Sequence, residues 1–321
     1  YWLNSSLSGT ITAANDGTDA ILTLPHVYTA NALAGGTTNI VIDTTHPTVS
    51  SVSVPANDTY TAGETLTFTV NTTENVVVDT AGGTPQIALT IGSTTRYATY
   101  QSGSGSTALE FAYIVQAGDV DANGITIGAL SANSGTMKDV AGNDLIVALN
   151  SAGSTTAVLV DAAPPTVSSV DVPTAGSYRA GETLSFTVNL SEAVTVVGSP
   201  KLALTVGSTT RDATFQAGGS STALVFAYTV QAGEDDTDGI AVGSLSANGG
   251  AMKDAAGNDL VLALNAVGNT ANVLVDNTDP SINLVRVPIV GTYGPTETLG
   301  FLLDMSEAVT VSGTPNLSIT V

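Results

Sequence analysis

STALEFAYIVQAG (Ser106–Gly118) recurs almost unchanged as STALVFAYTVQAG (Ser221–Gly233), and this repeated stretch decides the fold class. In its first copy the large apolar side chains occupy every second position, at Leu109, Phe111 and Tyr113. Side chains of a β-strand alternate between its two faces, so this spacing predicts a strand with one face in a core and the other in solvent. We find no stretch with a convincing helical period, and we therefore expect an all-β protein.

The linkers that open with aspartate set the length of the repeat. DTTHP, DAAPP and DNTDP begin at Asp43, Asp161 and Asp276, so the intervals are 161 − 43 = 118 and 276 − 161 = 115 residues. We predict two complete repeats at 43–160 and 161–275. We further predict that 1–42 is the C-terminal part of a preceding repeat and 276–321 the N-terminal part of a following one. The chain is then expected to be either a fragment of a longer array or a subunit whose half-domains neighbouring chains complete.

Each complete repeat is predicted to hold many short strands and no helix. Alternating strands separated by Gly-containing turns, within about 115 residues, are typical of a β-sandwich. The chain has no cysteine, so the expected likeness is to immunoglobulin-like architecture without its disulfide. Because the linkers are short and contain proline, we expect the tandem immunoglobulin-like β-sandwich domains to form an extended rod. In the first repeat the strands are expected near 49–54, 64–71, 75–79, 86–91, 95–101, 107–116, 125–130, 145–149 and 156–160.

The charge balance narrows the classes of partner. The chain carries 28 acidic against 7 basic residues, for a formal net charge of −21. Such a surface repels nucleic acid and anionic lipid, so neither is an expected partner. It attracts cations, and Ca²⁺ is the candidate because it prefers carboxylate oxygens; the alternative is that the charge only keeps the chain soluble. No apolar run approaches the ~20 residues that a membrane helix needs, and we expect no membrane insertion.

One candidate calcium site is the acidic loop after the repeated strand. GDVDANGI (Gly118–Ile125) aligns with GEDDTDGI (Gly233–Ile240), and each loop has oxygen-bearing side chains at alternate positions followed by glycine. This resembles the first half of an EF-hand loop, although leucine stands where the bidentate glutamate would follow. The alternative is an acidic turn without metal. The candidate ligands are Asp119, Asp121, Asn123, Glu234, Asp236 and Asp238.

A second candidate site lies at the junctions between repeats. The linker aspartates Asp43, Asp161 and Asp276 could bridge consecutive domains through Ca²⁺, or could merely cap strand ends. Their candidate partners are Glu64, Glu182 and Glu297 in one stretch, and Glu74, Glu192 and Glu307 in another. The repeated K-D-x-A-G-N-D segment, with Asp139, Asn143 and Asp144 and then Asp254, Asn258 and Asp259, is interpreted first as a tight turn and second as a metal site.

Nothing in the sequence favours catalysis. His26 and His46 occupy unmatched positions, no nucleophile–histidine–carboxylate set or phosphate loop recurs, and the single tryptophan is Trp2. We therefore do not expect an enzyme, and we rank a carbohydrate-binding module last because Phe111 and Tyr113 follow the core alternation.

The repeats resemble a known class of protein. PTVSSVDVPTAGSYRAGETLSFTVNLSEAVTV (Pro165–Val196) and KDAAGNDL (Lys253–Leu260) are similar to the long immunoglobulin-like repeats of large bacterial surface adhesins, including repeats of cyanobacterial surface proteins linked to swimming motility. The resemblance implies a secreted, extracellular location at the cell surface and a role as an extender in cell adhesion or biofilm formation. It also implies Ca²⁺ binding and contact with neighbouring repeats, other cells, surfaces or copies of the chain. The alternative function is a subunit of a surface filament, sheath or S-layer.

Overall fold

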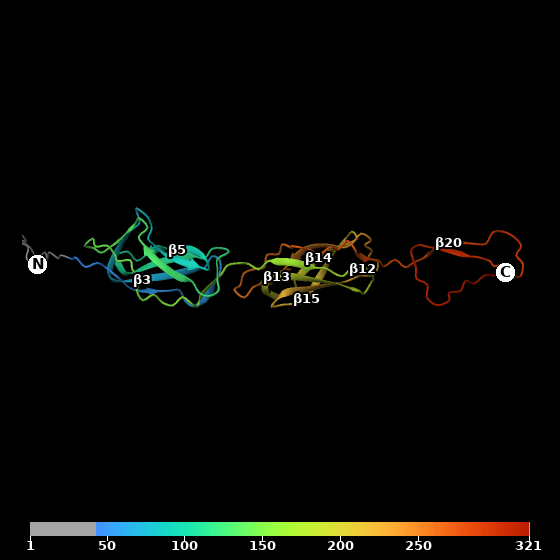
Figure 1. Cartoon of the computed structure of the whole chain (residues 1–321), viewed down its shortest axis with the longest axis horizontal. Helices are drawn as coiled ribbons and strands as arrows, with labels where there is room; N and C mark the ends of the chain where they lie inside the picture. Colours follow the sequence, from blue (N-terminus) through green and yellow to red (C-terminus); the bar gives the residue numbers. More distant parts are fainter. Residues whose placement is uncertain (1–42, 321) are drawn as a thin grey trace, which may run out of the picture.

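The structure is a computed structural model that describes residues 43–320, so the prediction for residues 1–42 lies outside the described residues. Within residues 43–320 every regular element is a β-strand and there is no helix. The prediction of an all-β chain is therefore confirmed for this part. Figure 1 shows two groups of strands, followed by a separate strand pair near the C-terminus. We call the residues of β1–β10 the first unit and those of β11–β19 the second unit.

The first unit contains a large antiparallel sheet and a small second sheet. The large sheet has the order β1-β3-β6-β5-β4-β8, with β9 paired to β3, and the small sheet has the order β2-β10-β7. Pairing is parallel between β2 and β10. The strands are β1 (Val49–Ser53), β2 (Asp58–Tyr60), β3 (Thr65–Asp79), β4 (Gln86–Ile91), β5 (Thr94–Ser102), β6 (Ser106–Ile114), β7 (Val120–Asp121), β8 (Thr126–Ser131), β9 (Thr136–Lys138) and β10 (Val158–Asp161).

The second unit repeats this arrangement. Its large sheet has the order β11-β13-β16-β15-β14-β17, with β18 paired to β13, and β12 pairs with β19 in parallel. β3 and β13 have the same length and the same burial pattern. The strands are β11 (Val167–Asp171), β12 (Gly176–Tyr178), β13 (Thr183–Val197), β14 (Lys201–Val206), β15 (Thr209–Ala217), β16 (Ser221–Thr229), β17 (Ala241–Ser246), β18 (Ala251–Lys253) and β19 (Val273–Val275).

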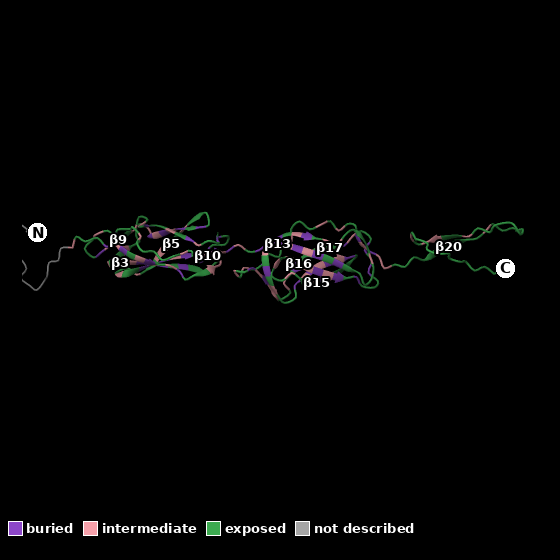
Figure 2. Ribbon diagram, turned by 60° about the horizontal axis from the view of Figure 1, so that its bottom comes forward, coloured by how far each residue is buried: buried purple, intermediate pink, exposed green. Residues whose placement is uncertain are grey.

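The repeated stretch supplies the central strand of each core. In β6 the alternating side chains Leu109 and Phe111 are fully buried, and Phe111 lies opposite Phe68 of β3. In β16 the same relation joins Phe226 to Phe186. Figure 2 shows buried residues concentrated on the strands of both units. The sheets pack their inner faces on two separate cores, as expected for a β-sandwich; along the chain, the first core ends at Ala162 and the second begins at Val167.

Three of the expected strands differ from the observed ones. The segments 64–71 and 75–79 form one strand, β3, because a bulge rather than a turn lies between Asn71 and Val76. The expected strand at 145–149 is wrong: this segment makes only isolated bridges, and the side chains of Ile146 and Val147 are exposed. Their apolar character therefore does not mark a core strand.

The last strands form an isolated pair. β20 (Ile282–Arg286) and β21 (Leu302–Met305) place Val285 opposite Leu303, which repeats the pairing of Val170 with Val188 at a spacing of 115 residues. The pair therefore keeps the register of β11 and β13. Its apolar side chains are exposed, as Figure 2 shows for β20. Among residues 43–320 no helix is long and apolar enough to cross a membrane.

Candidate metal centre

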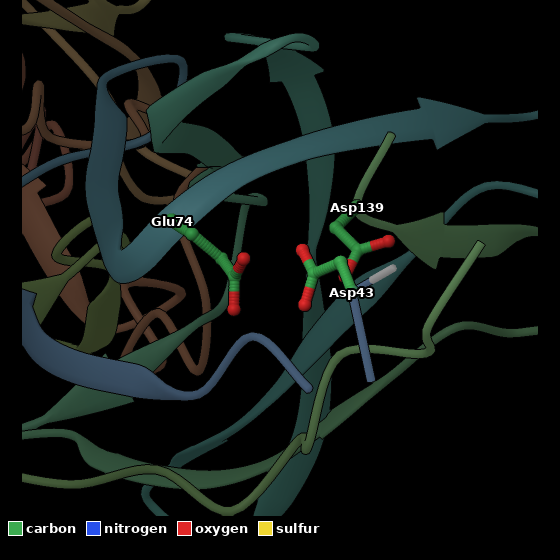
Figure 3. A group of neighbouring side chains, drawn as sticks. All are labelled: Asp43, Glu74 and Asp139. Carbon is green, nitrogen blue, oxygen red and sulfur yellow. The ribbon is translucent and has the colours of Figure 1, made fainter. Parts of the chain in front are cut away.

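Three carboxylates from distant parts of the sequence converge beside the first unit. One carboxylate oxygen each from Asp43, Glu74 and Asp139 can be chosen so that all lie within 4.8 Å of one another. Figure 3 shows these side chains approaching from three separate segments of the chain. Two oxygens bound to the same Ca²⁺ lie at most about 5 Å apart, twice a Ca²⁺–O distance, so the spacing is compatible with one shared ion. We call this group the first cluster.

The same arrangement occurs once more, at the start of the second unit. Asp161, Glu192 and Asp254 also place their oxygens within 4.8 Å of one another. We call them the second cluster. The three members sit at the repeat-equivalent positions of Asp43, Glu74 and Asp139. Acidic side chains that came close by chance in one unit would not be expected to do so at the same three positions of the other unit. The cluster is therefore a feature that both repeats share.

A β-bulge positions the glutamate. In β3 the pairing with β6 jumps from Asn71↔Ala108 to Val76↔Ser106, so the residues between them are looped out of the ladder. Glu74 lies within this bulge, and the hydroxyl of Thr72 donates to the Glu74 carbonyl at 2.7 Å. β13 has the same jump, and Glu192 lies within it. Bulges commonly redirect a side chain away from the regular pleat, and here they direct the glutamate to the other carboxylates.

The K-D-x-A-G-N-D turn holds the buried carboxylate. Asp139 is 5 % exposed, and its Oδ1 accepts from the amides of Ala141 (2.8 Å) and Asn143 (2.9 Å). The Asn143 side chain donates to Asp139 Oδ2 at 2.8 Å. Asp254 Oδ1 accepts from the backbone amides of Gly257 (2.7 Å) and Asn258 (2.8 Å), and its Oδ2 accepts from the Asn258 side chain at 2.9 Å. Burial would raise the pKa of Asp139, but these hydrogen bonds outweigh it and hold the pKa below its ordinary value. This carboxylate is therefore kept ionised.

The asparagine of this turn also anchors the linker. Besides Asp139, Asn143 Nδ2 donates to the backbone carbonyl of Asp43 at 3.3 Å. Asn258 does the same to the carbonyl of Asp161 at 3.0 Å. The Asp43 side chain also bonds to the linker backbone, since its Oδ1 accepts from the Thr45 backbone amide at 2.9 Å. One amide side chain thus fixes two members of each cluster relative to each other.

The second cluster joins the two units. Asp161 is the last residue of β10, and its backbone pairs with Val120 of β7 in the first unit. Its carboxylate lies with Glu192 and Asp254, which both belong to the second unit. An ion held here would bind the end of one unit to the bulge and turn of the next.

The electrostatics of both clusters favour a cation. Burial, followed by the charges of Asp43 and Asp139, raises the pKa of Glu74. Burial and the charges of Asp161 and Asp254 raise the pKa of Glu192 in the same way. None of the ion pairs within residues 43–320 includes a carboxylate of either cluster. Like charges thus face one another, and no lysine or arginine within residues 43–320 pairs with them; nearby His46 lowers the Glu74 pKa less than burial and the two aspartates raise it. Oxygen-only ligands are those that Ca²⁺ prefers.

The acidic loop after the repeated strand has another role in the structure. Asp119 is 3 % exposed. Its carboxylate accepts hydrogen bonds from Arg96 Nη2 (2.6 Å), from the Tyr113 hydroxyl (2.5 Å) and from the backbone amide of Gln116 (3.0 Å). Burial, then the hydrogen bond to Asp119, raises the pKa of Tyr113 to about 12. The side chain ties the loop to β5 and β6. The structure therefore explains Asp119 without a metal ion.

The remaining loop residues follow the same pattern. Glu234 replaces Asp119 in the second unit and accepts from Arg211, the Tyr228 hydroxyl and the Gln231 amide. Asp121 Oδ2 accepts from the Gly92 amide at 2.7 Å, and Asp236 Oδ2 from the Gly207 amide at 2.6 Å. The Asn123 backbone amide donates to Asp121 Oδ1 at 3.2 Å. Asp238 belongs to neither group of acidic residues within residues 43–320 that could share one ion. The prediction that these loops bind Ca²⁺ stays a prediction, and the geometry favours the clusters over the loops.

The glutamates of the A-G-E-T-L stretch lie elsewhere. Glu64 Oε2 accepts from the Thr61 amide at 2.6 Å and Glu182 Oε2 from the Arg179 amide at 2.6 Å, so each closes a tight turn. Neither belongs to a cluster. Sequence reasoning placed Glu64 and Glu182 among the expected ligands and named Glu74 and Glu192 only as further candidates, because the bulge that directs Glu74 and Glu192 is not visible in the sequence.

The third junction has two of the equivalent residues. Asp276 Oδ1 accepts from the Thr278 amide at 3.1 Å. Glu307 occupies the position of Glu74 and Glu192, and its Oε1 is buried without a hydrogen-bond donor among the described residues.

No known protein-family model matches this chain, and no curated protein shows significant sequence similarity to it.

Proposed function

We propose that this chain is a structural and adhesive extender segment of a secreted cell-surface protein, and that Ca²⁺ at the junctions stiffens it. In this proposal the units are tandem immunoglobulin-like β-sandwich domains arranged as an extended rod. The role is mechanical and not catalytic. It fits cell adhesion, biofilm formation or surface projection.

One observation carries the proposal: Asp161 belongs to the last strand of the first unit, while the other carboxylates of its cluster belong to the second. A cation shared by these side chains would restrict the angle between the units. The repetition of the cluster at Asp43 supports a role that every junction needs. A fixed junction is useful in an extender, because a flexible chain of domains cannot hold its end far from a surface.

A filament subunit is the second candidate, and a specific observation favours it. Apolar side chains of the β20–β21 pair are exposed, with Ile282 at 55 % where the equivalent Val167 is 3 % exposed. Another chain could cover them. However, residues 1–42 resemble only the last third of a repeat, so they would not supply the equivalents of β5 and β6, which follow β3 in the large sheet. Mass in solution at increasing concentration tests this candidate: a chain that stays monomeric with Ca²⁺ contradicts it.

The calcium proposal is tested by thermal unfolding of the whole chain in EDTA and in millimolar Ca²⁺. An ion at ~100 times its dissociation constant adds about 2.7 kcal/mol of stability per site. We expect Ca²⁺ to raise the Tm by several degrees, and D161N to remove much of the rise. D238N is the matched control, since it removes the same charge from an exposed residue of the acidic loop outside both clusters. Equal loss in D161N and D238N, or no calcium effect on the wild-type chain, would contradict the proposal.

A further inference from the structure

The two units differ on the outer face of their large sheets. Tyr97 of β5 and Ile114 of β6 are 48 % and 55 % exposed in the first unit. The second unit has Asp212 and Thr229 at the equivalent positions. There Asp212 pairs with Lys201 at 2.9 Å, while Gln86 takes the place of Lys201 in the first unit. The first unit thus has an aromatic and apolar patch where the second has an ion pair.

Strand register brings the patch together. Ala88 lies opposite Tyr97, and Thr65 lies opposite Ile114. β5 and β6 are antiparallel, and Thr99 of β5 lies opposite Ala112 of β6. Two residues before Thr99 and two residues after Ala112, Tyr97 and Ile114 therefore lie at the same level. Neighbouring strands are about 4.8 Å apart, which places the two side chains in contact range. They form one row across β4, β5, β6 and β3.

A shallow groove of about 360 Å³ follows this row. Its walls carry hydroxyl and amide groups beside the aromatic ring, and none of its lining residues is acidic or basic. Gln101 Nε2 donates to the Thr99 carbonyl at 3.0 Å, and Gln116 Nε2 donates to the Ile114 carbonyl at 2.6 Å. These bonds hold both amides along the strands. The main lining residues are Thr65, Tyr97, Thr99, Gln101, Ile114 and Gln116.

We propose that this groove is a binding site for a neutral oligosaccharide. An aromatic face packs on the C–H face of a sugar ring, while amides and hydroxyls exchange hydrogen bonds with its hydroxyl groups. The net charge of −21 disfavours an anionic ligand. The lining has no carboxylate to pair with a basic peptide. A groove of this volume is at the small end of ligand sites, which fits a few sugar units.

This inference goes beyond the extender function, and it rests on a side chain outside the core alternation. A carbohydrate-binding module ranks last from sequence because Phe111 and Tyr113 follow the core alternation, and both are indeed buried. Tyr97 lies on the opposite, exposed face of the sheet, so the core alternation does not exclude it from binding a ligand. The groove shares no residue with either carboxylate cluster, so either proposal can fail alone.

The test is binding of the whole labelled chain to an array of neutral oligosaccharides, followed by titration of the strongest one. We expect Y97S/I114T to weaken binding roughly tenfold or more, the loss expected when a central aromatic contact is removed. Both side chains are about half exposed, so the Tm should fall only slightly and its calcium response should not change. D212S, at the position equivalent to Tyr97 in the second unit, should bind like the wild-type chain.

Three results would overturn the inference. The first is that the wild-type chain binds no neutral oligosaccharide on the array. The second is that Y97S/I114T binds as strongly as the wild-type chain. The third is self-association in sedimentation that disappears in Y97S/I114T while glycan binding is absent, which would assign the patch to contact between copies of the chain.

Discussion

At the scale of single residues, the glutamates of the two clusters destabilise the fold when no cation is bound. Burial and neighbouring carboxylates raise the pKa of Glu74 and of Glu192 in the folded chain. A carboxyl group whose folded pKa is raised favours folding while it is protonated. That contribution is complete below its ordinary pKa and is lost as the pH rises through the folded value. At neutral pH a bound cation would offset the repulsion.

The double variant E74Q/E192Q tests whether these glutamates destabilise the fold without a cation and stabilise it with one. In EDTA at neutral pH we expect it to be more stable than the wild-type chain, because the amide removes one charge from each cluster. The difference should shrink as the pH falls through the raised pKa of these glutamates, because the wild-type side chains then take up protons. In Ca²⁺ the variant should show little rise in Tm. Thermal unfolding across this pH range measures both effects, and a variant that is less stable than wild type in EDTA at every pH would contradict the explanation.

Asp119 behaves in the opposite way. Burial would raise its pKa, but hydrogen bonds from Tyr113, Gln116 and Arg96 lower it below the ordinary value. A lowered carboxyl pKa contributes stability above the unfolded pKa, and that stability is lost as the pH falls through the folded pKa. Asp119 thus favours the folded state at neutral pH, whereas Glu74 opposes it.

We expect D119N to destabilise the first unit by about 1–3 kcal/mol, the usual cost of losing hydrogen bonds to a charged group. The variant should also lose part of the acid sensitivity of unfolding. D212N is the control, because its ion pair with Lys201 is exposed and such pairs contribute about 0–1 kcal/mol. Urea unfolding at neutral pH compares the two. Equal stability of D119N and the wild-type chain would show that the Asp119 contacts contribute nothing.

At the scale of elements, each cluster depends on two irregular features placed side by side. The bulge of β13 supplies Glu192, and the turn after β18 supplies Asp254 and Asn258. Asn258 donates both to Asp254 and to the Asp161 carbonyl. It is a positioning residue, because it contacts two members of the cluster through one amide group.

N258A should therefore weaken calcium binding without removing a carboxylate. Loss of such a supporting contact typically lowers metal affinity about 10–100-fold. Isothermal titration of the whole chain with Ca²⁺ would show one weakened site, while the first cluster keeps its affinity. Q216A is the control, since within residues 43–320 the Gln216 side chain bonds only to Thr214 of its own strand. Unchanged affinity of both sites in N258A would contradict a positioning role.

At the scale of the whole molecule, the second cluster determines how the units respond to calcium. Asp161 is fixed in the first unit by its pairing with Val120, and its carbonyl is held by Asn258 of the second. The linker between the units contains Pro164 and Pro165. An ion in the cluster would add metal–oxygen bonds that connect the two units across this linker. Bending between the units should therefore decrease when calcium binds.

Small-angle X-ray scattering tests this change in flexibility. We expect Ca²⁺ to increase the maximum dimension of the chain and to narrow its distribution of shapes relative to EDTA. D161N should scatter alike in both conditions, whereas D238N should respond like the wild-type chain. A calcium response that D161N retains in full would place the effect elsewhere in the molecule.

The sequence by itself determined the all-β class and the periodic core, because alternation in Ser106–Gly118 follows directly from strand geometry and because the repeat multiplies the signal. It also identified the linker aspartates and the K-D-x-A-G-N-D segment as candidate metal-binding residues. Only the tertiary structure decided that Asp161 meets Asp254 and Glu192 rather than Glu182, since these residues are far apart in the chain and a bulge sets the direction of the glutamate. The structure likewise assigned Asp119 to Arg96 and Tyr113, because ligand spacing along a loop does not reveal which donors the folded chain brings to it.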